Sequence, residues 1–158
     1  MKNVQPLLIL CLGNEVVSDD RLGYEIWLRL SKCALPEDVE ALFEPAAGFR
    51  LLDLLSGRRR VLIVDAIITG SAPPGALHFF PAGHLTPSRQ LTSSHQINLP
   101  TALELGRMMD IPMPDKIDVL AVEAEDVTTL KEALTEPVAM VVPEVVQKAL
   151  DWIKDSCS

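Results

Sequence analysis

The stretch Leu-Leu-Ile-Leu-Cys-Leu at residues 7–12 decides the fold class of this chain. Six consecutive apolar residues that end at a Gly-Asn turn signal are typical of a strand buried on both faces. Similar runs follow at residues 61–64 and 117–122, and each has the length of a strand. Strands that are apolar on both faces belong to parallel sheets covered by helices on both sides.

The segments between these runs have helical patterns. Leu22, Ile26 and Leu30 recur at i, i+4 and i+8, which predicts a helix over 19–32 with Ser18 as its N-cap. We expect further helices and strands at the remaining patterned segments: helices over 49–55, 100–109 and 143–154, the last starting at Pro143, and strands over 39–43 and 76–80, the second at a sheet edge. This alternation predicts one α/β domain over residues 1–158, in which helices cover a mostly parallel, twisted sheet of about five strands.

Composition excludes several function classes. The chain has 158 residues, 14 basic and 22 acidic, and a net charge of −8, which argues against nucleic acid and anionic membrane surfaces as partners. The first apolar run is too short to span a bilayer or to serve as a signal peptide. Three cysteines without a C-x-x-C pair indicate neither a disulfide framework nor a zinc knuckle. We therefore expect a cytoplasmic protein.

Three polar side chains follow the predicted strands, where parallel sheets hold their sites. Asp20 comes after the first strand together with Asp19, Asp65 ends the strand over 61–64, and His95 lies just ahead of a predicted helix. Helix capping by the two neighbouring aspartates, and a capping or surface role for His95, are the plain alternatives. Together, two carboxylates and an imidazole suit a divalent cation such as nickel or zinc, with positions left open for water or substrate.

The order and spacing of three short motifs resemble those of the [NiFe]-hydrogenase maturation endopeptidases. The motifs are Leu12-Gly-Asn-Glu-Val-Val-Ser-Asp-Asp20 with Gly23, Val64-Asp-Ala66, and Ser94-His-Gln96. The resemblance implies a three-layer α/β/α sandwich of the phosphorylase/hydrolase-like kind. It also implies removal of a C-terminal extension from the precursor of a hydrogenase large subunit, its partner, after nickel insertion. By the same resemblance Asp20, Asp65 and His95 contact the metal, and Asp20 or Asp65 is the candidate general base.

Two roles for the metal stay open at this point. In the first, the three side chains contact nickel that the precursor already holds. In the second, they bind a cation themselves, and this cation polarises the scissile carbonyl or activates a water. Zinc or another divalent cation can then act as a surrogate for nickel. A non-catalytic metal-binding or chaperone-like module of the same fold is the alternative. A receiver-type signalling domain fits less well, because its acidic pair follows the first strand directly, whereas in this chain six residues, 13–18, separate Asp19 and Asp20 from that strand. The chain departs from the family pattern at Cys11, Arg21 and 45–48, which bears on the choice of partner.

Overall fold

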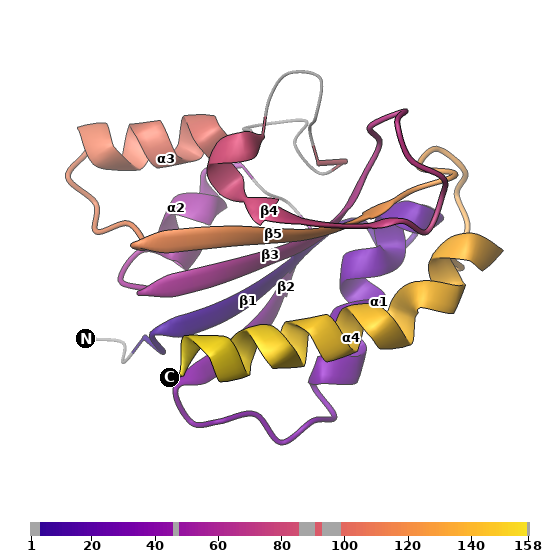
Figure 1. The fold of residues 1–158 in the computed structure, drawn as a ribbon. Coiled ribbons are helices and arrows are strands. Elements are labelled where there is room, and N and C mark those ends of the chain that lie inside the picture. Colours follow the sequence, from indigo (N-terminus) through magenta and orange to yellow (C-terminus); the bar gives the residue numbers. More distant parts are fainter. Residues whose placement is uncertain (1–3, 46–47, 86–90, 93–98, 158) are drawn as a thin grey trace.

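The structure is a computed structural model that describes residues 4–45, 48–85, 91–92 and 99–157. Figure 1 shows the elements along the chain. In chain order they are β1 (Leu7–Leu12), η1 (Asp19–Arg21), α1 (Leu22–Leu30), β2 (Val39–Glu44), α2 (Arg50–Leu55), β3 (Arg60–Ile67), β4 (Leu77–Pro81), η2 (Ala82–His84), α3 (Leu99–Met108), β5 (Lys116–Glu123) and α4 (Glu136–Ser156). None of the helices in these residues combines the length and apolar character that a membrane span requires.

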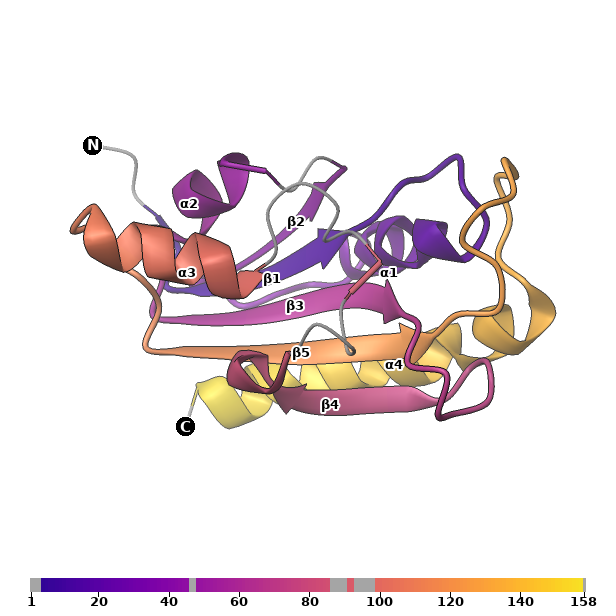
Figure 2. The same ribbon diagram turned by 90° about the horizontal axis from the view of Figure 1, so that it is seen from above.

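The strands form one sheet in the order β2-β1-β3-β5-β4. The first four are parallel and β4 runs antiparallel to β5 at the edge. Figure 2 shows the arrowheads of the parallel strands pointing to one end of the molecule and that of β4 to the other. The predicted α/β class, the mostly parallel sheet and the edge position of the strand near residue 80 are confirmed.

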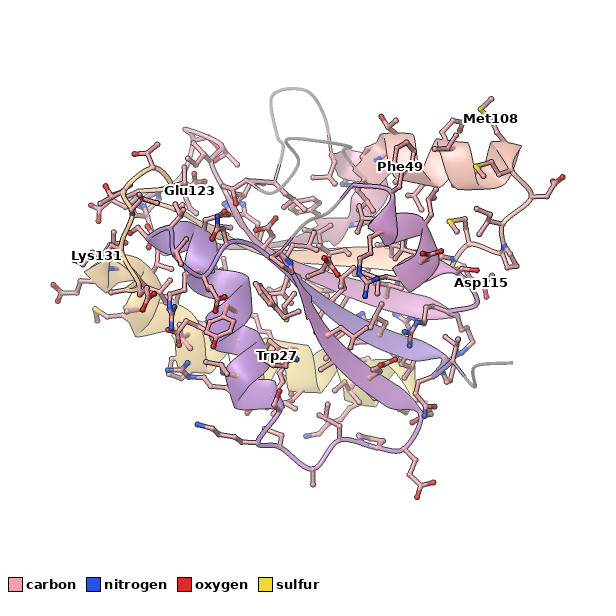
Figure 3. All side chains as sticks on the ribbon, turned by 180° about the vertical axis from the view of Figure 1, so that it is seen from behind. Trp27, Phe49, Met108, Asp115, Glu123 and Lys131 are labelled. Atoms are coloured by element: carbon pink, nitrogen blue, oxygen red, sulfur yellow. The ribbon has the colours of Figure 1, made fainter. Side chains whose placement is uncertain are left out.

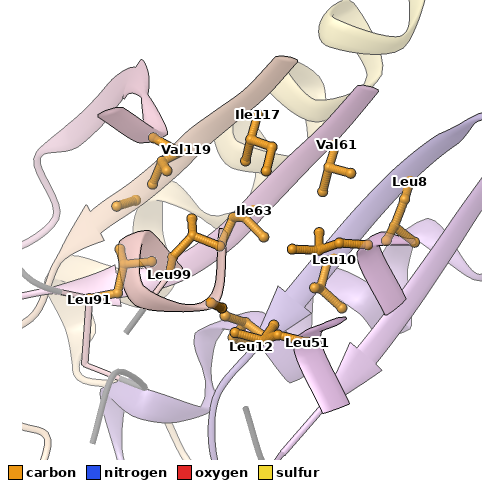
Figure 4. Packing of buried hydrophobic residues seen from close by; sticks show 14 of the residues in the cluster. Leu8, Leu10, Leu12, Leu51, Val61, Ile63, Leu91, Leu99, Ile117 and Val119 are labelled. Carbon is orange, nitrogen blue, oxygen red and sulfur yellow. The ribbon is translucent and has the colours of Figure 1, made fainter. Parts of the chain in front are cut away.

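Helices cover both faces of the sheet (Figure 1). This arrangement follows from β1, which is apolar at every position and directs alternate side chains to opposite faces, so that both faces must be buried. Leu8 and Leu10 pack with residues of α2 and α3, as Figure 4 shows for that face. Leu7, Ile9 and Cys11 pack with α1 and α4 on the other face. Each fully buried leucine or isoleucine contributes about 1.5–3 kcal/mol to folding, so this strand anchors both layers.

Three predicted positions are wrong. The last helix begins at Glu136 rather than Pro143, which lies inside α4. The helix continues through this proline because Val138, Val142 and Val145 bury one stripe against the sheet, and that packing outweighs one missing N–H. Ser18 makes no side-chain capping hydrogen bond, because the chain enters α1 through the short turn η1.

The third correction concerns Asp65, which lies within β3 and not at its end. The strand continues two residues further, to Ile67, because Ile67 still pairs with Glu123 of β5. The carboxylate therefore starts from a rigid strand position and is completely buried.

Candidate functional site

The candidate site lies at the carboxyl ends of the neighbouring strands β1 and β3. The connections of these neighbouring strands leave in opposite directions, a switch point at which parallel sheets form crevices. The pairing of β1 with β3 ends at Cys11 and Val64, so the last residues of β3 extend beyond β1. Leu91 pairs there with Ile67, and the backbone N–H of Thr92 donates to the Ala66 carbonyl at 3.0 Å.

The structure brings two predicted site residues together at this point. Thr92 Oγ1 lies 2.6 Å from Asp20 Oδ1 and 3.2 Å from Asp65 Oδ1. Asp65 Oδ1 also accepts the backbone N–H of Ala66 at 2.7 Å. The Asp65 side chain is fully buried, whereas Asp20 is partly exposed. Two carboxylates that are far apart in sequence thus share one hydroxyl. His95, the third predicted residue, lies outside the described residues.

Two glycines place Asp20 by letting the start of α1 approach the end of β1. A Cβ atom on Gly23 would lie 2.1 Å from the Leu12 carbonyl oxygen, and one on Gly13 would lie 2.1 Å from the Asp20 carbonyl oxygen. The Asn14 N–H donates to the Asp20 carbonyl at 3.0 Å. The spacing of the first motif therefore has a steric origin, because only glycine allows backbone contact this close.

Asp19 has a different role from its neighbour. Its carboxylate is fully buried and accepts the backbone N–H groups of Glu125, Asp126 and Thr135 at 2.8–3.0 Å, and also the Thr135 hydroxyl. Asp19 thus joins the start of α1 to the loop that leads into α4. We therefore assign Asp19 to the framework of the site.

Another buried carboxylate, that of Glu123, lies at the end of β5. It accepts hydrogen bonds from the backbone N–H of Thr69, at 2.8 Å, and from the Thr69 hydroxyl, and it lies 3.2 Å from His78 Nε2. These contacts hold the loop after β3 against the sheet edge. His78 thus has a structural partner in β5, whereas His84 is exposed in η2.

Cys11 is the cysteine nearest the site in sequence, and its environment makes a thiolate unfavourable. Burial, and to a smaller extent the negative charge of Asp65, raise the pKa of its thiol far above the ordinary value. A nucleophilic cysteine needs the opposite conditions. Cys11 is therefore a packing residue of β1.

The donors in this site are compatible with a cation. Carboxylate oxygens are good ligands for divalent cations, and an additional imidazole would favour nickel or zinc. Within the described ranges there is no group of three or more His, Cys, Asp or Glu side chains placed to hold a metal ion. Asp20 and Asp65 thus supply two donors, and any third must come from elsewhere.

Sequence patterns did not identify Thr92 as a site residue. It belongs to none of the three motifs, and threonine has no chemical signature that singles it out. Its position three residues before His95 was the available signal, but only the fold shows that its hydroxyl reaches Asp20.

Comparisons with known proteins agree with this fold and show the family. A family model described as hydrogenase maturation protease matches residues 30–152. The hydrogenase 2 maturation protease of Escherichia coli K12 is 28% identical over 139 residues, which are 83% of this chain and 84% of that protein.

Solved structures extend the likeness to the whole fold. The hydrogenase maturating endopeptidase HybD from E. coli has a TM-score of 0.81 and 25% identity, and the match covers 95% of this chain and 93% of that one. The [NiFe] hydrogenase maturation protease HybD from Thermococcus kodakarensis, at 22% identity and a TM-score of 0.71, shares the fold over 93% of this chain and 98% of its own. The chain belongs to the hydrogenase maturation protease family.

Proposed function

We propose that this protein is an endopeptidase that removes a C-terminal extension from the precursor of a [NiFe]-hydrogenase large subunit once nickel has been inserted. Asp20, Asp65 and His95 would contact the nickel that the precursor presents, so that cleavage depends on metal loading. The observation that supports this proposal best is the meeting of Asp20 and Asp65 at the switch point between β1 and β3. Membership of a protease family supports the type of reaction.

The hydrolytic step needs a base that water can reach. Asp20 is the better candidate, since its side chain is partly exposed while that of Asp65 is buried. The carboxylate would take a proton from a water as that water attacks the scissile carbonyl carbon. The C–N bond then breaks and the proton passes to the leaving amine. A cation beside the two carboxylates would polarise the carbonyl.

The surface around the site suits a large folded substrate. The loop between β1 and η1 and the loop between β5 and α4 lie side by side at the carboxyl end of the sheet (Figure 2). Val17 pairs with Leu130, and Lys131 N–H donates to the Val16 carbonyl at 2.9 Å, so we call 15–18 with 128–131 the rim ribbon. Leu130 is 79% exposed there, an apolar contact available to a protein partner.

The test is a cleavage assay on a purified nickel-loaded large-subunit precursor, followed by intact mass. Wild-type protein should release one short C-terminal peptide, and it should leave the metal-free precursor intact. Asp65→Asn should abolish cleavage. Asp115→Asn is the matched control, because this exposed aspartate lies at the opposite end of the molecule from Glu123 and the site (Figure 3).

The alternative function gives a different result. A metal-binding or chaperone-like module would bind the nickel-loaded precursor in a pull-down but leave its mass unchanged over hours. That outcome, seen with every precursor encoded beside this chain, would reject the endopeptidase.

A further inference from the structure

We propose that Thr92 is a positioning residue that holds the Asp20 and Asp65 carboxylates side by side before the substrate arrives. This inference rests on the proposed function. It goes beyond it by assigning a role to a residue outside the motifs and outside the Asp/Asp/His set. The geometry around one hydroxyl oxygen carries it.

The backbone of Thr92 is held in place independently of the two aspartates. Leu91 is buried in the cluster under α2 and α3 (Figure 4) and pairs with Ile67, and the Thr92 N–H donates to Ala66. The hydroxyl therefore starts from a point attached to β3. A side chain on such a fixed backbone can hold a more flexible side chain in place, because the fold has already restricted its own conformational freedom.

The hydroxyl has one proton, and three oxygens of the described residues lie within hydrogen-bonding distance of it. Asp20 Oδ1 is nearest at 2.6 Å, the Ala66 carbonyl lies at 3.1 Å and Asp65 Oδ1 at 3.2 Å. The short distance assigns the proton to Asp20, which makes this a charge-assisted hydrogen bond. It draws Asp20 toward β3 and toward the second carboxylate.

This bond matters because two carboxylates repel each other. Asp65 is fixed by its strand and by the Ala66 N–H, but Asp20 lies on the short turn η1 and is partly exposed. Loss of the hydroxyl removes the charge-assisted hydrogen bond that draws Asp20 toward Asp65 against this repulsion. Misplacement of a catalytic group by about 1 Å lowers the rate by up to about 100-fold. Thr92 would therefore affect the rate of cleavage more than the binding of precursor.

The experiment compares Thr92→Val with Thr92→Ser in the precursor cleavage assay. Valine keeps the branched shape without the hydroxyl, and serine keeps the hydroxyl. We expect Thr92→Val to lower kcat roughly 10- to 100-fold with KM unchanged within about twofold, and Thr92→Ser to retain at least about a third of the wild-type kcat. Ser156→Ala removes another buried hydroxyl, at the C-terminal end of α4, and should cleave like wild type.

The outcomes separate the two proposals. No cleavage by the wild-type protein overturns the proposed function and this inference with it. If the wild-type protein cleaves and Thr92→Val has a normal kcat, only the role of Thr92 is overturned. The same holds if Thr92→Ser is as slow as Thr92→Val. Should the valine variant not fold, Thr92→Ala removes the same hydroxyl and allows the same comparison.

Discussion

The carboxylate of Asp19 binds Thr135, a residue 116 positions further along the chain, through both the backbone N–H at 2.8 Å and the side-chain hydroxyl. Asp20, the next residue, is bound by the hydroxyl of Thr92. Two adjacent aspartates thus belong to different parts of the molecule. One closes the fold between α1 and α4, and the other faces the candidate site.

Alanine at each of these two positions should separate stability from activity. Asp19→Ala leaves several buried donors without an acceptor, so we expect a loss of about 3 kcal/mol in the free energy of unfolding. Asp20→Ala should cost less than about 1 kcal/mol yet stop precursor cleavage. Urea unfolding followed by tryptophan fluorescence measures the first effect and the mass assay the second. Equal losses of stability would contradict this division of roles.

Alanine at Gly23 should disturb both the fold and the placement of Asp20. The Cβ atom would lie 2.1 Å from the Leu12 carbonyl oxygen, and neither α1 nor β1 can move far where the helix packs on the sheet. We expect a loss of about 2 kcal/mol or more in unfolding free energy and slower cleavage. Gly83→Ala is the control, because among the described residues no atom beyond its chain neighbours lies within 4 Å of the added Cβ. Similar unfolding curves for the two variants would show that the close approach is not needed.

The rim ribbon should contribute to binding of the precursor and not to the chemical step. Leu130→Asp is expected to raise KM by about tenfold, which corresponds to a loss of about 1.4 kcal/mol in binding free energy. The kcat should be nearly unchanged. Met108→Asp is matched in exposure, 74% against 79%, but lies at the far end of the molecule (Figure 3). Its kinetics should equal those of the wild type. A tenfold fall in kcat for Leu130→Asp with unchanged KM would instead place Leu130 in the chemical step.

The three cysteines should differ in their reaction with iodoacetamide. Burial and the nearby Asp65 raise the pKa of Cys11, so it should stay unmodified while the protein is folded. Cys157 is exposed and should react first, and Cys33, which is partly exposed, should follow. Peptide mapping after timed quenching, with and without urea, measures this order. Labelling of Cys11 in the folded protein at the rate of Cys157 would refute it.

The turn at Asp126, which leads into residues 128–131 of the rim ribbon, should be sensitive to acid. The Thr129 side chain and the backbone N–H groups of Thr128 and Thr129 bind Asp126 and lower its pKa to about 2. Because the folded pKa lies below the unfolded one, this stabilisation is complete above about pH 4. It is then lost as the pH falls toward 2. Carboxyl NMR should show the low midpoint, and Asp126→Asn should remove this part of the acid dependence; a midpoint near 4 would contradict the assignment.

Local patterns predicted most of the fold because the decisive elements are apolar on both sides. The run at 7–12 cannot be an exposed strand, and helical spacing at Leu22, Ile26 and Leu30 determines which face packs inward. The pattern misplaced the start of the last helix because a proline is common in a first turn, and Pro143 looked like one. The buried valines on both sides of it decide otherwise, and they act only once the sheet is present.

For the candidate site, the sequence by itself determined the residue types, the order of the motifs and the glycines that bring Asp20 to the end of β1. Only the tertiary structure decided that Asp19 faces the framework while Asp20 faces Asp65, and that Thr92 lies between the two carboxylates. The physical reason is that the direction of a side chain depends on contacts with residues far away in the chain. Thr135 and Thr92 are such residues, and no local spacing identifies them.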